Sequence, residues 1–247
     1  MGKLRHLSFG SNQFTNVPTS VAKMSALEVL DVAPKCPGDH VLSKYTEMIS
    51  NYICDVCAAR GKVCSEMWGC RRCDWDACGK CCHRQQLSII PESIGRLCHL
   101  RVLRVVKHAV VVFPESLCSL TALEELILSH NLLEALPEGI AGLYALQKLH
   151  LAGNRLAALP EALGELSVLQ ELDLGSNLLE SLPESLGQLG ALRRLSLRSN
   201  ALRALPEGFG ALSGLRELDV DAGLIERLPD SFEQRSLLPE NFRYENR

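Results

Sequence analysis

The sequence predicts an α/β solenoid that carries a small inserted domain. Three observations lead to this prediction: a repeated stretch, one interruption of its period, and a crowd of paired cysteines inside that interruption. The stretch at 146–168 returns with the same apolar spacing at 169–191 and again at 192–214. A fixed period of 23 residues is the sequence sign of stacked structural repeats, none of which can bury its apolar face alone.

Each repeat supplies one coil with a short strand, a turn and a returning arc. In the coil 146–168 we expect apolar side chains to fill the interior from both sides, namely Leu146, Leu149, Leu151, Leu156, Leu159, Leu163 and Leu166. We expect Asn154, Asn177 and Asn200 to occupy the turns, because a carboxamide can both donate to and accept from neighbouring backbone groups. The prolines after each turn, Pro160, Pro183 and Pro206, fix φ where no ladder N–H is needed.

The pattern L-x-x-L-x-L-x-x-N-x-L, followed by L-P-x-x-h-x-x-L in the arc, resembles the leucine-rich repeat family. Among its classes the chain is most similar to the 23-residue, Ras-group-like intracellular repeats, over about four fifths of its length. This resemblance implies a horseshoe with a parallel β-sheet on its concave face. It also implies a protein partner bound in that concavity.

Coil starts follow one another at intervals of 23, except for one interval of 73 between Leu27 and Leu100. The excess of 50 predicts a domain inserted at a turn of the scaffold, where insertions break few backbone contacts. We therefore expect repeats in 1–33, an inserted domain in 34–83, and repeats continuing through 84–247. The coil starts are Leu4, Leu27, Leu100, Leu123, Leu146, Leu169, Leu192 and Leu215.

Two coils depart from the pattern. His108 stands where the third coil should have its turn Asn, and Gly223 stands there in the eighth. Arg235 replaces the last apolar residue of the eighth coil, which indicates that the core closes there, with 237–242 as a partial cap. Nothing caps the first strand at Leu4, so either a partner covers this end or the chain belongs to a longer one.

The insert holds eight metal-ligating residues in four close pairs. In order they are Cys36 and His40, Cys54 and Cys57, Cys70 and Cys73, and Cys78 and Cys81. Eight ligands suit two closed tetrahedral zinc sites. We expect the pairs to alternate, so that one site takes Cys36, His40, Cys70 and Cys73 and the other takes Cys54, Cys57, Cys78 and Cys81. Cys64 and Cys82 are left as spare thiols, and Cys98 and Cys118 in the arcs are expected to fill small buried positions.

The order of these ligands resembles the protein-kinase-C-type cysteine-rich zinc domain. The segments YICDVC and MWGCRRCDWDACGKC are still more similar to its divergent plant relatives and to the ZZ-type finger. Cys78 departs from the protein-kinase-C-type pattern, which has His there, and no distal Cys follows. Cys36 is expected to fill that role, with Cys82 or His83 as substitutes. Trp68 and Gly69 abut Cys70, so little remains of the apolar loop by which diacylglycerol binders enter membranes.

Composition narrows the classes of partner. A formal net charge of −3 favours neither nucleic acid nor an anionic membrane surface. No apolar run approaches the ~20 residues of a membrane span, and the N-terminal segment lacks the apolar core of a signal peptide. Paired cysteines of this spacing indicate metal binding in a reducing compartment, so we expect the cytoplasm or the nucleus. No nucleophile–base set or phosphate-binding glycine loop stands out, and the chain is not expected to be an enzyme.

Residues that flank the buried leucines of each strand should face the concave side. The candidate partner-binding residues there are Arg104, Glu125, Lys148, His150, Glu171, Asp173, Arg194, Arg198, Glu217 and Asp219. Neighbouring strands lie ~4.8 Å apart. Glu125, Lys148, Glu171, Arg194 and Glu217 can therefore pair as a ladder of alternating charge. One interpretation is that the charges of this ladder pair only with one another and bind no partner. The other is that its uneven ends, basic at Arg194 and Arg198 and acidic beyond them, orient a charged protein partner.

These observations favour a non-enzymatic interaction scaffold or adaptor, with the two-zinc module as a second recognition surface. Two alternatives use the module differently. It could act like a RING that recruits a ubiquitin-conjugating enzyme, although RING ligand order places the His in the middle of the motif. It could also anchor a lipid-responsive adaptor, although membrane lipid is not the expected partner.

Overall fold

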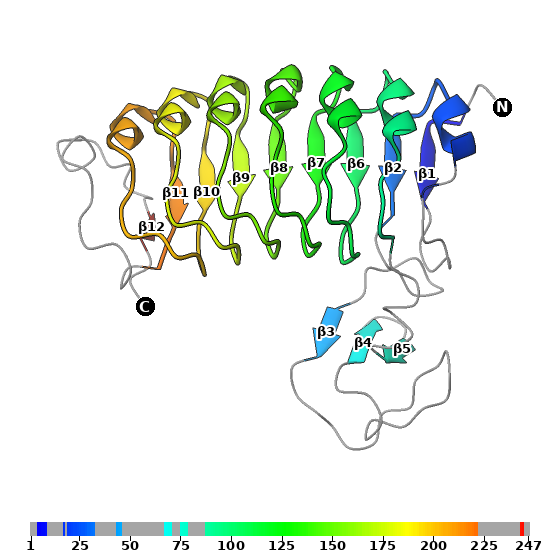
Figure 1. Ribbon diagram of the computed structural model, residues 1–247, viewed down its shortest axis with the longest axis horizontal. Coiled ribbons are helices and arrows are strands. Elements are labelled where there is room, and N and C mark those ends of the chain that lie inside the picture. Colours follow the sequence, from blue (N-terminus) through cyan, green and yellow to red (C-terminus); the bar gives the residue numbers. More distant parts are fainter. Residues whose placement is uncertain are drawn as a thin grey trace.

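The structure is a computed structural model that describes residues 4–8, 17, 19–32, 43–45, 67–70, 75–78, 87–221 and 243–244. Its main body is a parallel sheet of nine strands stacked side by side (Figure 1). In order across the sheet they are β1 (His6–Ser8), β2 (Val29–Asp31), β6 (Val102–Arg104), β7 (Glu125–Ile127), β8 (Lys148–His150), β9 (Glu171–Asp173), β10 (Arg194–Ser196), β11 (Glu217–Asp219) and β12 (Arg243–Tyr244). The predicted solenoid with a parallel sheet is therefore confirmed.

The helices of the arcs are shorter and tighter than α-helices. Each is a five-residue 3-10 helix: η1 (Thr19–Lys23), η2 (Glu92–Arg96), η3 (Glu115–Ser119), η4 (Glu138–Gly142), η5 (Glu161–Glu165), η6 (Glu184–Gln188) and η7 (Glu207–Ala211). In η2 to η7 a proline, with φ between −77° and −65°, stands just before the helix. A hydrogen bond such as the one from Leu166 N–H to the Leu163 carbonyl then closes the arc at i−3. The "α" layer of the predicted fold is thus built from 3-10 turns.

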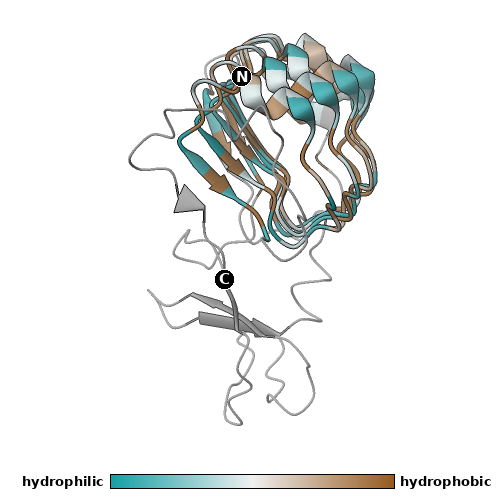
Figure 2. Ribbon diagram, turned by 90° about the vertical axis from the view of Figure 1, so that its left-hand side faces the viewer, coloured by the Kyte–Doolittle hydropathy of each residue, from teal (hydrophilic) through white to brown (hydrophobic). Residues whose placement is uncertain are grey.

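A single continuous core runs along the interior of the stack. Viewed along the array, the strands line one side of each coil and the 3-10 helices lie across the interior from them (Figure 2). In the coil 146–168, six of the seven predicted core leucines are fully buried, and Leu159 is half-buried against the same core. Gly187 marks where neighbouring arcs approach most closely, since a Cβ there would lie 2.2 Å from the Gly208 carbonyl oxygen.

Two cysteines of the arcs are less buried than the sequence suggested. Cys98 is exposed and Cys118 is half-buried. The prediction of a buried Cys98 was wrong because that residue follows the buried Leu97, at the turn where the chain leaves η2. Burial raises the pKa of the Cys118 thiol to about 11, so it stays protonated at neutral pH.

The turn asparagines form a ladder that ties each coil to its neighbours, as predicted. Asn177 donates from Nδ2 to the carbonyls of Leu174 at 2.9 Å and Leu151 at 3.1 Å, and its Oδ1 accepts from Leu156 N–H at 3.1 Å. Asn131, Asn154 and Asn200 repeat these three bonds at the same spacing in sequence. The residue before each Asn has a positive φ, between 54° and 70°, which turns the carboxamide into the coil.

Asn177→Ala is expected to lower the free energy of unfolding by about 1–3 kcal/mol, because backbone groups of four residues lose a hydrogen-bond partner. Glu171→Ala removes a partly exposed ion-pair partner from the sheet face and should cost less than about 1 kcal/mol. A denaturant titration of both variants measures the difference. Equal costs for the two substitutions would contradict the structural role of the Asn ladder.

A second ladder, of glutamates, was not predicted. The Glu that follows the proline of one coil accepts a hydrogen bond from a backbone N–H at the start of the next 3-10 helix. Glu138 accepts from Ala162 at 3.2 Å, and Glu184 accepts from Gly208 at 2.9 Å. Glu92 and Glu161 make the same bond. The recurring Pro-Glu pair was the available signal, and these carboxylates satisfy N–H groups that a helix start leaves unpaired.

The interruption of the period leaves the sheet unbroken. β2 pairs directly with β6 in parallel, with Val29 opposite Val102. Between these strands in sequence, β3 (Ser43–Tyr45), β4 (Met67–Cys70) and β5 (Trp75–Cys78) form a separate antiparallel sheet. Figure 1 shows this small sheet off the edge of the array at which β2 ends. At the other end, β12 follows the segment predicted as a cap and adds a ninth strand to the sheet. Gly223, Arg235 and 237–242 lie outside the described residues.

Candidate partner-binding face

The outward side of the parallel sheet, here called the sheet face, collects the predicted partner-binding residues. In most strands the middle residue is buried and its two neighbours are partly exposed, because successive side chains of a strand alternate between faces. The register aligns equivalent residues across the strands, so that Glu125, Lys148, Glu171, Arg194 and Glu217 form one row. Arg104, His150, Asp173 and Asp219 lie in the second row, and Arg198 follows β10.

Most charges of the row are paired, though not in one continuous ladder. The Lys148 ammonium lies 3.2 Å from Glu125 Oε1, and Arg194 pairs with Glu171. Other pairs cross between the rows: Arg104 lies 3.1 Å from Glu125 Oε2, and His150 Nε2 lies 3.6 Å from Glu171 Oε2. Arg198 pairs with Asp219. The sequence predicted the row, whereas the cross-row pairs depend on side-chain reach that spacing alone does not give.

The Glu125 carboxylate on the sheet face has two cationic partners, Arg104 and Lys148. Its partial burial raises its pKa, but hydrogen bonds and charge from Lys148 and Arg104 outweigh burial, so the pKa lies below its ordinary value. This carboxylate therefore stays charged near neutral pH and is already occupied by two cations. The middle of the sheet face offers little unbalanced charge to a partner.

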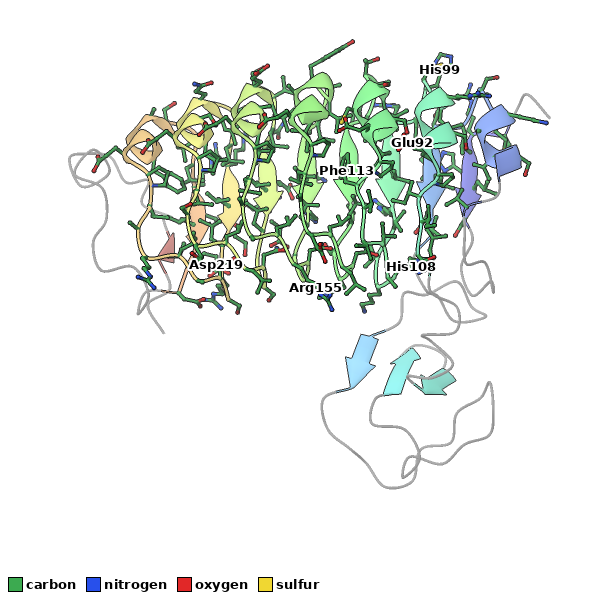
Figure 3. The ribbon with its side chains drawn as sticks, viewed as in Figure 1. Glu92, His99, His108, Phe113, Arg155 and Asp219 are labelled. Carbon is green, nitrogen blue, oxygen red and sulfur yellow. The ribbon has the colours of Figure 1, made fainter. Side chains whose placement is uncertain are left out.

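Charge is unbalanced over strands β8 to β11. A shallow hollow of about 240 Å³ lies there, and its charged or titratable lining residues are His150, Glu171, Asp173, Arg194, Glu217 and Asp219. The lining thus holds four carboxylates against one guanidinium and one imidazole. Asp173 and Glu217 have no ion pair among the described side chains. Ser196 lies between Asp173 and Asp219 in the register, so a small side chain separates two carboxylates. Figure 3 labels Asp219 at this end of the array.

A second hollow, of about 500 Å³, lies at the ends where the strands begin. Its charged residues alternate in sign and are already paired: Arg5 with Glu28 at 3.5 Å, and Arg101 with Glu124 through a two-pronged contact at 2.7–2.9 Å. These residues follow directly after the coil starts, a row that the sequence prediction did not single out. Because its charges are mutually satisfied, it is a weaker candidate for a partner than the hollow over β8 to β11.

The predicted zinc ligands fall almost entirely outside the described residues. Cys36, His40, Cys54, Cys57, Cys73 and Cys81 lie outside them, and Cys70 and Cys78 are described only as strand residues of β4 and β5. Among the side chains that are described, no group of three or more His, Cys, Asp or Glu could hold a metal ion. The zinc sites remain a prediction.

None of the helices in the described part of the chain has the length and apolar composition needed to cross a membrane.

Comparison with solved structures finds the same fold. An internalin of Listeria monocytogenes has a TM-score of 0.59 at 17% identity, over 94% of this chain and 52% of that one. A leucine-rich repeat protein of Leptospira interrogans has a TM-score of 0.50 at 24% identity, over 97% and 60%. The plant peptide hormone receptor RGFR1, in complex with RGF2, has a TM-score of 0.56 at 21% identity, over 89% and 33%. This chain thus spans a third to three fifths of their lengths.

Sequence comparisons agree with the structural ones. No curated protein matches the chain. Residues 142–234 match the family model described as leucine-rich repeat region, and residues 98–156 match the model described as leucine rich repeat. Together the two matches cover more than half of the sequence. The chain is a leucine-rich repeat protein.

Proposed function

We propose that this protein is a non-enzymatic interaction scaffold that holds a protein partner on its sheet face, over strands β8 to β11. Leucine-rich repeat proteins generally act in protein–protein interaction, and one structural neighbour is a peptide hormone receptor solved with RGF2. The observation that carries the proposal is the hollow over β8 to β11, which combines a recess with two carboxylates, Asp173 and Glu217, that have no ion pair among the described side chains.

The charge of this hollow selects the kind of partner. Four carboxylates outnumber the cations there, and Asp173 and Glu217 have no ion pair among the described side chains. A partner segment that presents Lys or Arg would complement this surface. Such charges steer association and fix register more than they add affinity, so binding should weaken as salt rises.

Charge reversal on the sheet face tests the proposal. Asp173→Lys combined with Glu217→Lys should abolish capture of the partner from a cell extract. Glu165→Lys combined with Glu180→Lys makes the same change in net charge at exposed positions off the sheet face, and it should leave capture intact. A protein that both variants recover equally is not bound by the sheet face. If every recovered protein behaves in this way, the proposal is contradicted.

We further propose that 34–83 form a two-zinc module that serves as a second recognition surface. The strand register supports the alternating ligand sets. Cys70 is opposite Trp75, and Cys78 is opposite Met67, so the two cysteines lie at opposite ends of the ladder. Three residues of an antiparallel strand span about 10 Å, whereas each thiolate must lie about 2.3 Å from its zinc. Cys70 and Cys78 therefore fit two different ions.

The zinc ions would act as structural ions in this proposal. Four protein ligands close each site, and thiolate and imidazole are the donors that zinc prefers. The chain would supply Cys36, His40, Cys70 and Cys73 to one ion and Cys54, Cys57, Cys78 and Cys81 to the other. A test for ubiquitin discharge and liposome sedimentation, each with the intact chain, separate this role from a RING-like and from a lipid-binding one.

A further inference from the structure

The turn beside the insert is built on a histidine. His108 occupies the position that Asn131, Asn154, Asn177 and Asn200 hold in later coils, and only 8% of its surface is exposed. Its Nδ1 accepts a hydrogen bond from Leu87 N–H at 3.1 Å, and its Nε2 bonds to the Val32 carbonyl oxygen. Figure 3 places His108 at the edge of the array on the same side as the small sheet of β3 to β5.

These two bonds reproduce those of the asparagine ladder across the insertion. Asn154 accepts from the N–H of the residue 21 positions before it and donates to the carbonyl 26 positions before it. Leu87 is likewise 21 positions before His108, and Val32 is 76 positions before it. Removing the 50 residues of 34–83 from that separation leaves 26. His108 therefore ties together the last described residue before the insert and the first described residue after it.

An imidazole differs from a carboxamide because it can take up a proton. With Nδ1 accepting from Leu87 N–H, the ring proton of neutral His108 lies on Nε2 and points at the Val32 carbonyl. A second proton must bind at Nδ1, which would then be a donor facing another donor. The bond to Leu87 cannot survive that change, while the bond to Val32 can.

We propose that His108 is a proton-controlled clasp at the base of the insert. The neutral imidazole hydrogen-bonds Val32 and Leu87, the described residues that flank the insert. The protonated imidazole gives up the bond from Leu87 N–H, while the bond from Ala109 N–H to the Leu87 carbonyl, at 2.9 Å, is retained. Val32 and Leu87 are thereby both tied to His108 at neutral pH, and the tie to Leu87 is lost in acid. This inference does not depend on the proposed partner site.

The surroundings set the pH at which the clasp opens. Burial lowers the pKa of His108, and the hydrogen bond to the Val32 carbonyl opposes that effect in part. Four titratable or charged residues of the described part lie near His108 and its two partners. They are Asp31 beside Val32, Arg104 and Lys107 on the coil of His108, and His130 on the next coil. None of them is among the causes of the lowered pKa.

The sign of the pH dependence follows. The folded protein resists protonation of His108 more than the unfolded chain does, whose His pKa is about 6.5. The stability that the clasp contributes is therefore present above that value and falls as pH drops below it. The clasp itself opens as pH falls through the lowered pKa of the folded state.

Hydrogen exchange at two matched amides tests the clasp. Leu87 N–H donates to His108, and Leu133 N–H donates to the non-titrating Asn154 at 3.0 Å. In the intact chain, the protection factor of Leu87 should fall at least about tenfold between pH 7.5 and pH 5, while that of Leu133 stays constant. Protection of Leu87 that follows Leu133 at both pH values would overturn the proposal.

Substitutions at position 108 separate proton uptake from other effects of acid. His108→Asn should protect Leu87 at both pH values, because the carboxamide makes the same bonds without titrating. His108→Ala should leave Leu87 unprotected at both. All three chains carry the same predicted zinc ligands, so any acid effect on metal appears in each of them. An equal pH response in His108→Asn and in the parent chain would contradict the clasp.

Discussion

A chain in which Ala33 is joined directly to Arg84 is expected to fold as an uninterrupted array. β2 already pairs with β6 in parallel, so the sheet does not depend on the insert. In the spliced chain Val32 and Leu87 stand 26 and 21 positions before His108, the offsets at which Asn154 meets Leu128 and Leu133. Every backbone partner of His108 is therefore retained without a shift of register.

The stability of the spliced chain should lie within about 1 kcal/mol of the parent value. Removing a long connection between adjacent ends changes the loop-closure entropy only slightly, while Gln85 replaces Asn at the turn of the second coil. Circular dichroism and a denaturant titration measure the outcome. A spliced chain that is insoluble or unfolded would show that 34–83 are a structural part of the array rather than a domain inserted in its loop.

Cys70→Ser should unfold the inserted module and leave the array folded. Binding of a structural zinc ion contributes about 10–16 kcal/mol to the folding of a small module with little core of its own. The array draws its stability from neighbouring coils, so its circular dichroism should be nearly unchanged. Proteolysis of the insert, followed by mass spectrometry of the fragments, reports on the module separately.

Cys64→Ser is the matched control for that substitution. Cys64 lies in the same insert but belongs to neither predicted ligand set. It should leave the resistance of the insert to proteolysis unchanged. If Cys64→Ser and Cys70→Ser have the same effect, the assignment of Cys70 as a ligand and Cys64 as a spare thiol is wrong.

The array could be predicted from sequence because the same short-range interactions recur in every coil. A period of 23 with fixed apolar positions places Leu149 in the core and Glu171 on the sheet face. Each neighbouring coil independently predicts the same placement for its equivalent residues. The turn Asn could be predicted for the same reason, since its backbone hydrogen bonds need only the stacking of one coil on the next.

Features that depend on side-chain reach were harder to predict. Glu138 resembles an ordinary surface residue in sequence, and only the close stacking of η4 on η5 brings its carboxylate to the Ala162 N–H. Arg104 reaches sideways to Glu125, a pairing that the straight rows of the sheet do not suggest. His108 was recognised as an irregular turn residue, but its role required knowing that Val32 and Leu87 meet beside it.

The candidate site was predicted in outline and refined by geometry. Spacing identified the ten residues of the sheet face, whereas the pairing of Lys148 with Glu125 and of Arg194 with Glu171 shows which charges are already satisfied. What remains is a hollow with acidic excess at one end of the array.

We propose one leucine-rich array with a two-zinc module inserted at its second coil. Elemental analysis of the purified protein tests this proposal. The intact chain should carry two zinc ions, and the chain lacking 34–83 should carry none. One zinc or none in the intact chain, or zinc retained after removal of 34–83, would contradict the assignment of Cys36, His40 and their six partners as two closed sites.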